Sequence, residues 1–559
     1  MGSPSLERFP DPFEHLPSTP LTFDHINEGR DLAPSSRGSP LLNLPIEILT
    51  KVIRNFVPIA DKEDLACLAL VNRDCRQLAR SCQFRSINLD FGKRATSVIG
   101  VLFEEAVERS RNRGRTRLPS LGACIRHVKV SNDHFWTQVE ALKSGPLDGL
   151  HFHEDDREPM TEAQLELWRD NVSDLNQRKA DVYDPSMLFA ISSLPHLDVL
   201  DLGEFAVNQY LLDSLTASVC RHLRARLSIA HTNVRIPALA WPLETLSLGL
   251  SWDFETWYPS KGSNLDASPV LGPLLRKCSQ SLQTLRINLQ ELHRKTTKPV
   301  SFTLDFPRLR SLKICCTLHP TALESLVTDR LTTLIVDYGV QTTRDYLDCR
   351  GQLRDLSLLV WDGFDIPDNA SIQMLSDNQQ ITAFGIEYSQ SAALIDRVLP
   401  VLANFSHLSS LSIIWEGTEV PESSLHMLAC LVSLKNLHIS AGNQAGWRHD
   451  WETSQDSMRS ILSPLERLKS LLFTRDSYMR AQGSPGLQPG TDTDYYHMIG
   501  FSWSSHVTRM SRYVAAYSSV FSDLQFVFIG QIPFNVGSGS WIDGPRDEGF
   551  NAKNYSLGI

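Results

Sequence analysis

The chain has 559 residues, of which 42% are hydrophobic and 21% charged, and its formal net charge is −10. Because single hydrophobic cores stop growing at about 250–300 residues, this length predicts several domains or one elongated repeat array. The acidic balance argues against a dedicated nucleic-acid-binding protein, since phosphate contacts require a basic surface.

Segments that would place the chain in or across a membrane are missing from the sequence. The N-terminus lacks the charged and apolar regions of a signal peptide, and no apolar run is long enough to span a bilayer. The ten cysteines are scattered without a repeating spacing. We therefore expect an intracellular protein, cytoplasmic or nuclear, with free thiols and no membrane partner.

The N-terminal 40 residues are rich in Pro, Ser, Asp and Gly and have few apolar residues in register. This composition predicts a disordered tail over residues 1–40. Beyond it we expect a helical module over residues 41–90, a repeat domain over 91–534 and a polar tail over 535–559. The Gly- and Pro-rich composition of residues 476–496 predicts a mobile loop inside the repeat domain.

Residues 44–56 have the apolar spacing of one face of an amphipathic helix. Pro45 suits the first turn of that helix, where its missing N–H costs nothing. A second helical pattern follows Asp61, the expected N-cap, with Glu63 and Asp64 near the positive end of the helix dipole. The sequence therefore predicts several short helices packed into a small module.

The order of short motifs in this module resembles the F-box. The motifs are Leu44-Pro45, Glu47-Ile48-Leu49, Ile53, Asp64-Leu65, Leu70-Val71-Asn72-Arg73 and Leu78-Ala79. The sequence departs from the family where Asn72-Arg73-Asp74-Cys75 replaces the usual Cys-Arg-x-Trp. The resemblance implies a three-helix fold whose apolar face docks on a Skp-type adaptor of a cullin–RING ubiquitin ligase. The residues expected to share adaptor contact and the module's own core are Leu44, Pro45, Ile48, Leu49, Ile53, Leu65, Leu70 and Val71.

A different pattern, L-x-x-L-x-L, recurs from Phe84 onward. From Leu282 to Leu434 its first positions are 27, 22, 22, 28, 27 and 26 residues apart. This period is typical of leucine-rich repeats, in which each unit gives one short strand and a returning helix or turn. Helical patterns between the strands, as at residues 391–405 and 421–431, support that alternation. The predicted fold is α/β, an irregular solenoid with a curved parallel sheet and outer helices.

Residues that alternate with the inward leucines point away from the core of such a sheet. We expect substrate contacts from these outward positions, and an exposed Trp361 would suit a binding hot spot. The candidate substrate-binding residues are Arg286, Asn288, Lys313, Ile335, Asp337, Asp355, Leu359, Trp361, Ser412, Ile414 and His438.

Three clusters contain side chains that can bind metals or anions or react, but none of them predicts a functional site. His151 and His153 beside acidic residues 154–156 are too few for a metal site and suit a solvated loop. Cys315-Cys316 lies on an expected strand, so one thiol faces the core. The alternating arginines from Arg109 to Arg117 suit a solvated loop, although they could bind an acidic or phosphorylated partner or serve in nuclear import. We expect no catalytic residue, metal or cofactor.

An F-box-like start followed by degenerate repeats resembles the F-box/leucine-rich-repeat substrate receptors. In that family the F-box binds the Skp adaptor, and through it a cullin, while the repeats hold a protein substrate. Such a receptor acts by proximity and contributes no chemical group. The alternative is a leucine-rich-repeat scaffold without a ligase connection, in which the helical module only caps the repeats. The two differ in whether the apolar face of the module is exposed or packed on the repeats.

Overall fold

The computed structural model describes residues 13, 23–28, 38, 40–45, 48, 51–52, 62–90, 92–112, 114, 116, 119–131, 184–228, 235–236, 240–251, 267–289, 298–337, 340–362, 369–417, 419–442, 444–445, 448–449, 451–452, 454–474, 476–477, 503–529, 532–536 and 540–541. The chain divides into two compact units. The N-terminal unit comprises residues 16–298 and 304–307, and the C-terminal unit comprises residues 1–15, 299–303 and 308–559. No helix among the described residues is long and apolar enough to cross a membrane.

The N-terminal unit begins with short helices, which are α1 (Phe23–Ile26), α3 (Lys62–Val71) and α4 (Arg73–Gln83). The side chain of Asn72 caps α4 by accepting a hydrogen bond from the Cys75 amide at 2.8 Å. Ile26 and Leu42 pack with Leu78 of α4 and with Cys124. Residues 23–28 were expected to belong to a disordered tail, whereas the structure places α1 here, with Ile26 buried in the core of the helical module.

Parallel strands follow, paired in chain order. They are β1 (Ser86–Leu89), β2 (His127–Val130), β3 (Val199–Ala206), β4 (His222–Ser228), β5 (Thr245–Ser251) and β6 (Thr284–Leu289). The helices and the 3-10 turn between them are α5 (Lys93–Arg111), η2 (Gly122–Cys124), α8 (Asp184–Ser192), α9 (Gln209–Ala217) and α10 (Ser268–Cys278). Val128, Leu200, Leu223, Leu246 and Leu285 align across this sheet and are all buried.

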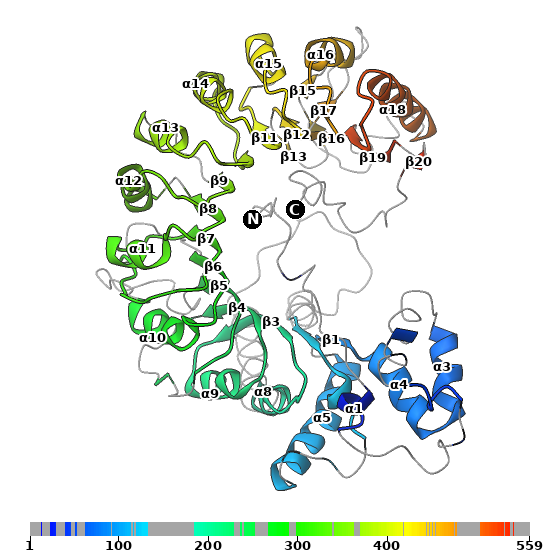
Figure 1. Cartoon of the computed structure of the whole chain (residues 1–559). Coiled ribbons are helices and arrows are strands. Elements are labelled where there is room, and N and C mark those ends of the chain that lie inside the picture. The colour runs from blue at the N-terminus through cyan, green and yellow to red at the C-terminus, as the bar shows by residue number, and fades with distance from the viewer. Residues whose placement is uncertain are drawn as a thin grey trace, which may run out of the picture. The chain divides into compact units, whose positions relative to one another are not determined.

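The C-terminal unit repeats the same alternation, with the helices on one face of the sheet (Figure 1). Its parallel strands are β7 (Ser311–Cys315), β8 (Thr333–Asp337), β9 (Leu358–Asp362), β10 (Ala383–Ile386), β11 (Ser410–Ile414), β12 (Asn436–Ser440), β16 (Ser470–Thr474) and β18 (Phe526–Ile529). Its helices are α11 (Pro320–Leu326), α12 (Gln341–Arg350), α13 (Asn369–Ser376), α14 (Ala392–Leu402), α15 (Glu422–Ala429), α16 (Gln455–Leu462) and α18 (Trp503–Ser518). The expected α/β alternation with a parallel sheet, typical of a repeat solenoid, is confirmed.

The last strands of the sheet change direction. β19 (Ile532–Asn535) pairs antiparallel with β18, and β20 (Ser540–Trp541) pairs antiparallel with β19. Residues from 535 onward were expected to begin a polar tail, but this hairpin extends the sheet past that point. Such a hairpin covers the backbone groups of the last parallel strand. Two small pairs lie outside the main sheet, β13 (Gln444–Ala445) with β14 (Arg448–His449) and β15 (Trp451–Glu452) with β17 (Asp476–Ser477).

The register of β9 differs from the expected one by three residues, an odd number that exchanges the inward and outward faces of the strand. Leu359 lies opposite Leu334 and Phe384, and Trp361 lies opposite Val336 and Ile386. The repeat motif is therefore Leu356-Leu359-Trp361 rather than Leu353-Leu356-Leu358. Leu359 and Trp361, expected to point outward, face the core, with 0% and 3% of their surface exposed. Residues 358–361 are all apolar, so a pattern of period two cannot fix which of them face inward.

The corrected register predicts that Trp361 stabilises the repeat core. Its ring meets Phe384 edge-on at a centroid distance of 5.0 Å. We expect Trp361→Ala to lower the free energy of unfolding by about 3–5 kcal/mol, because it removes a large buried side chain and leaves a cavity. Urea denaturation measures this change. The control is Asp355→Ala, whose exposed ion pair with Arg310 is worth at most about 1 kcal/mol. A loss of similar size in both variants would contradict the register.

Candidate functional site

Five of the exposed large apolar side chains among the described residues belong to the helical module. Leu70 and Val71, at the end of α3, are 80% and 65% exposed, and Ile48 is 46% exposed. Leu44 and Val52 are also exposed. Single exposed apolar residues are ordinary, but a group within thirty residues of one small module marks an interaction surface.

The structure separates the predicted adaptor-binding residues into three groups. Leu44, Pro45, Ile48, Leu70 and Val71 are exposed. Leu65 is buried and serves the module's own core. Leu49 and Ile53 lie outside the described residues. Val52 is also exposed, although it was not among the predicted adaptor-binding residues. The apolar spacing of residues 44–56, which places it on the same helix face, was the signal that could have identified it.

Gln77 of α4 attaches the module to the turn that precedes β2. Its side-chain amide nitrogen donates to the carbonyls of Ile26 and Ser120, at 2.8 Å each, and approaches the Cys124 sulfur at 3.3 Å. Gln77 is itself buried, so these bonds are shielded from water. One side chain of α4 thus joins α1, α4 and the turn before β2.

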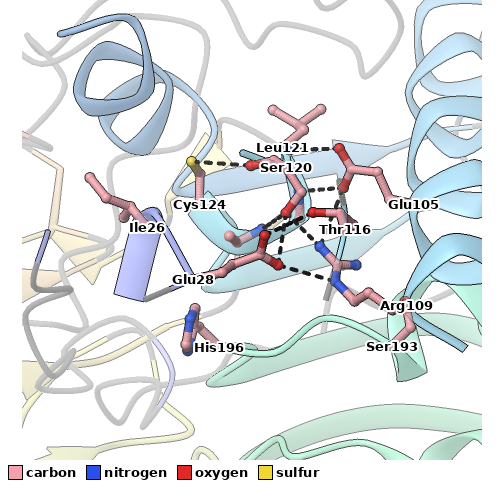
Figure 2. A network of polar contacts seen from close by, with 12 residues as sticks. Ile26, Glu28, Glu105, Arg109, Thr116, Ser120, Leu121, Cys124, Ser193 and His196 are labelled. Carbon is pink, nitrogen blue, oxygen red and sulfur yellow. Dashed lines mark hydrogen bonds and ion pairs between the residues drawn. The ribbon is translucent and has the colours of Figure 1, made fainter. Parts of the chain in front are cut away.

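A second contact, the polar junction, consists of Glu28, Glu105, Arg109, Thr116 and Ser120 (Figure 2). The Glu28 carboxylate accepts hydrogen bonds from the Thr116 hydroxyl at 2.8 Å and the Ser120 hydroxyl at 3.3 Å, and pairs with Arg109 Nε at 3.4 Å. Arg109 Nη2 donates to Ser120 Oγ at 2.6 Å and pairs with Glu105 at 3.4 Å. Both Glu28 and Arg109 are almost fully buried.

Glu105 also fixes the turn that carries Ser120. Its two carboxylate oxygens accept hydrogen bonds from the amides of Leu121 at 2.7 Å and Gly122 at 2.9 Å, at the start of η2. A carboxylate suits these unpaired amides, because the first N–H groups of a helical turn carry partial positive charge. A Cβ at position 122 would lie 2.8 Å from Arg109 Nη2, so any larger residue here would displace the guanidinium from these contacts.

Glu28 has a left-handed backbone conformation, with φ of 53°. It is the only residue other than glycine with a positive φ in the part of the chain that the structure describes. A side chain in this region costs energy and persists only when surrounding contacts enforce it. Here the enforcing contacts are those of the Glu28 carboxylate.

The arginine run was expected to be a solvated loop, and for Arg109 this expectation was wrong. Arg109 lies on α5 and is 5% exposed. Arg111 ends the helix and is exposed. Residues 113, 115 and 117 lie outside the described residues, so the expected loop is untested there. The acidic segment around His151 and His153 also lies outside them.

The predicted substrate-binding residues do not form one exposed surface. In the N-terminal unit, Asn288 is exposed and Arg286 is half-buried on β6. In the C-terminal unit, Asp355 is exposed in the turn before β9 rather than on a strand. Lys313 pairs with Asp362 at 3.4 Å, and Asp337 lies opposite Asp362 across β8 and β9.

The remaining candidates keep the outward direction but are buried. Ile335 and Ile414 are 2% and 0% exposed. The Ser412 hydroxyl lies 2.7 Å from His438 Nδ1, and His438 Nε2 lies 2.7 Å from the Thr474 hydroxyl. Asp362, which lies on the outward face beside Lys313 and Asp337, was not among the candidates because the three-residue register error on β9 assigned it to the inward face.

Comparison with known proteins gives no relative from which a function could be transferred. The sequence matches no protein-family model and no curated protein. Among the described residues, no group of three or more His, Cys, Asp or Glu side chains could hold a metal ion. The site is therefore defined by its own features, which are exposed apolar side chains in the helical module and buried polar contacts that attach the module to the turn before β2.

The polar junction predicts a large effect of removing one carboxylate. We expect Glu28→Ala to lower the free energy of unfolding by about 3 kcal/mol, because it leaves the buried Arg109 with less compensation. Urea denaturation of the full chain measures this loss. Glu104→Ala, at an exposed position of the same helix α5, should change stability by less than about 0.5 kcal/mol. Equal effects of the two substitutions would show that the polar junction contributes nothing to the free energy of unfolding.

The attachment of α1 should also weaken at acidic pH. Burial lowers the pKa of His196, and the His25 carbonyl at 3.1 Å from Nε2 offsets only part of this effect. The folded chain thus binds fewer protons than the unfolded chain below about pH 6.5. The neutral His196 imidazole therefore contributes its full share to folding stability above about pH 6.5, and this contribution is lost as the pH falls through the lowered pKa.

Urea denaturation between pH 8 and pH 5.5 measures this dependence. Burial also lowers the pKa of His127 and His222, which add a contribution of the same sign. His196→Gln should therefore make the fall in stability shallower without abolishing it. A stability that stays constant or rises on acidification would contradict the assignment of neutral, buried imidazoles.

Proposed function

We propose that this chain is the substrate-recognition subunit of an SCF-type cullin–RING ubiquitin ligase. The helical module acts as the F-box and binds a Skp-type adaptor, and the parallel strands act as degenerate leucine-rich repeats that hold a protein substrate. The observation that carries the proposal is the exposed apolar group of Leu44, Ile48, Val52, Leu70 and Val71.

The energetics of these side chains favour a partner protein. Burying each would contribute roughly 1.5–3 kcal/mol before the costs of association. Several such anchors are enough for a stable complex in which a partner covers a helical face. The repeat units bury their leucines almost completely, so the exposure in the helical module is not a general property of the chain.

The function requires no catalytic group in this chain. A receptor holds the target protein close to the charged ubiquitin-conjugating enzyme and so raises the effective concentration of the target's lysines. Two properties suffice, an adaptor surface and a substrate surface held in a defined relation. The buried bonds of Gln77 and of the polar junction supply a firm attachment between the helical module and the first strands.

A second candidate function is a repeat scaffold whose helical module only caps the first strands. The packing of Ile26, Leu42 and Leu78 against Cys124 favours it, because a cap needs such a contact. A cap does not, however, need exposed apolar side chains such as Leu70 and Val71. The exposed group therefore ranks the receptor above the scaffold.

The adaptor surface is tested by reversing its polarity. We expect Leu70→Asp combined with Val71→Asp to weaken binding of a purified Skp-type adaptor about 100-fold, which corresponds to the loss of two apolar anchors. Isothermal titration calorimetry measures the affinity. The matched control is Val432→Asp, at a 58% exposed position of the C-terminal unit, which should leave adaptor binding unchanged. An unchanged affinity of the double variant, or no adaptor binding by the wild type, would refute the receptor function.

A further inference from the structure

The sheet of the N-terminal unit carries basic side chains on one of its two faces. Its buried residues, such as Leu200 and Leu223, point to the face on which α8, α9 and α10 lie (Figure 1). Strand residues alternate between the two faces, so the residues next to these leucines point to the opposite, outward face. Four outward residues on β2, β4 and β6 are basic, and they define the cationic surface: Lys129, Arg224, Arg226 and Arg286.

Three members of the cationic surface lie in one row across the strands. Lys129 on β2, Arg224 on β4 and Arg286 on β6 are linked by the register of the strands between them. Because neighbouring strands are about 4.8 Å apart, successive basic residues of this row are separated by roughly 10 Å. An extended peptide spans that distance in about three residues. Arg226 lies two residues beyond Arg224 on the same strand and therefore faces the same side.

Two members of the cationic surface are available to a ligand. Lys129 and Arg226 are exposed, and neither side chain takes part in a hydrogen bond or an ion pair within the described part of the chain. Gly249 lies between Arg226 and the exposed Asn288 in the register of β4, β5 and β6. A Cβ at position 249 would lie 3.3 Å from Arg226 Cγ and no closer than 3.9 Å to other atoms. The glycine therefore leaves space beside the arginine.

Carboxylates on β3 neutralise the cationic surface only in part. Asp201 pairs with Arg224 at 3.3 Å, and Glu204 lies opposite Arg226 in the register. Four basic residues against these two acidic ones leave an excess of two positive charges on the outward face of β2 to β6. The chain as a whole has a formal net charge of −10, so this excess is a local property of the surface.

Among the described residues, the outward face of the C-terminal unit has no equivalent group of basic side chains. Ile335 and Val360 are apolar and buried there, and Lys313 is paired with Asp362 at 3.4 Å. An anionic ligand therefore matches the outward face of the N-terminal unit rather than that of the C-terminal unit.

The side chains of the cationic surface favour phosphate or carboxylate groups on a protein segment. A guanidinium binds either group through two parallel hydrogen bonds, and an ammonium adds a point charge. A nucleic acid fits less well, because nucleic-acid-binding surfaces are strongly basic and this surface includes two carboxylates. The roughly 10 Å spacing of the row suits anionic groups that recur about every third residue of an extended peptide.

We propose that the cationic surface binds an anionic segment of a protein substrate, whose phosphate or carboxylate groups contact Lys129, Arg224, Arg226 and Arg286. The inference rests on the proposed function, because it names the class of substrate that the receptor would hold. The binding itself requires no adaptor.

Fluorescence anisotropy with labelled peptides and the full-length chain tests the proposal. Three ten-residue Gly/Ala peptides carry phosphoserine, glutamate or serine at positions 2, 5 and 8. We expect the phosphoserine or the glutamate peptide to bind at least tenfold more tightly than the serine peptide, and the tighter of the two identifies the anionic group that is recognised. Equal affinities for all three peptides, or no measurable binding, would overturn the proposal. Tighter binding of a ten-nucleotide single-stranded DNA would also overturn it, because the ligand would then be a nucleic acid.

Matched charge reversals locate the binding to the cationic surface. Lys129→Glu combined with Arg226→Glu should weaken binding of the anionic peptide at least tenfold, and the milder pair Lys129→Gln with Arg226→Gln at least threefold. The control is Lys93→Glu combined with Arg94→Glu, which makes the same change in net charge at exposed positions in the first turn of α5. Carboxylates are favourable at that end of a helix, so the control should fold normally.

The control pair should change the peptide affinity less than twofold. An equal loss of affinity in both charge-reversal pairs would show that only the net charge of the chain matters, and would refute the site. Circular dichroism verifies that each variant is folded. Since the titration contains no adaptor, a failure of peptide binding leaves the adaptor test unaffected, and a failure of adaptor binding leaves the peptide result unaffected.

Discussion

No strand of this protein can bury its inward side chains without a neighbouring strand beside it. Leu334, Leu359, Phe384, Leu411 and Leu437 illustrate the constraint, because each is fully buried only as one member of a row across parallel strands. Stability is then a sum of contacts between neighbours, and the two ends of the array need separate solutions. The chain ends its sheet with the antiparallel hairpin of β19 and β20, and it packs the helical module against the turn that precedes β2.

Attachment of the helical module depends on polar contacts as well as on the apolar packing around Cys124. Gln77 and Glu28 each bind residues of the 116–120 segment, and the Glu28 carboxylate does so beside a buried guanidinium. Burying these groups costs desolvation energy, and hydrogen bonds of defined direction compensate for it only in one arrangement. An apolar interface of the same size could slide, whereas this one has a single orientation.

The sequence was sufficient to predict features that recur, and it was insufficient for contacts between distant segments. The α/β alternation followed from the spacing of leucines, and α14 and α15 lie where the apolar periodicity placed helices. The register of β9 was mispredicted because residues 358–361 (Leu358, Leu359, Val360 and Trp361) are all apolar. Either alternate set of these residues could therefore be assigned to the inward face. The partners of Glu28 are 81 to 92 residues away in sequence, and no local pattern marks such pairs. Among the residues predicted to bind an adaptor, Leu70 and Val71 are exposed, whereas Leu65 is buried because a small helical module must also fill its own core.

The polar junction lies near the first strands of the sheet in the N-terminal unit, where a small rotation produces a larger displacement of the strands further along. Parallel strands are spaced by about 4.8 Å, so β6 lies roughly 24 Å from β1 along the sheet of the N-terminal unit. A rotation of about 10° between the helical module and β1 would therefore displace β6 by about 4 Å. Hydrogen bonds at two separate positions, Gln77 and Glu28, resist such a rotation, whereas a single point of contact would permit it. The placement of β6 relative to the helical module thus depends on a few hydrogen bonds at the start of the sheet in the N-terminal unit.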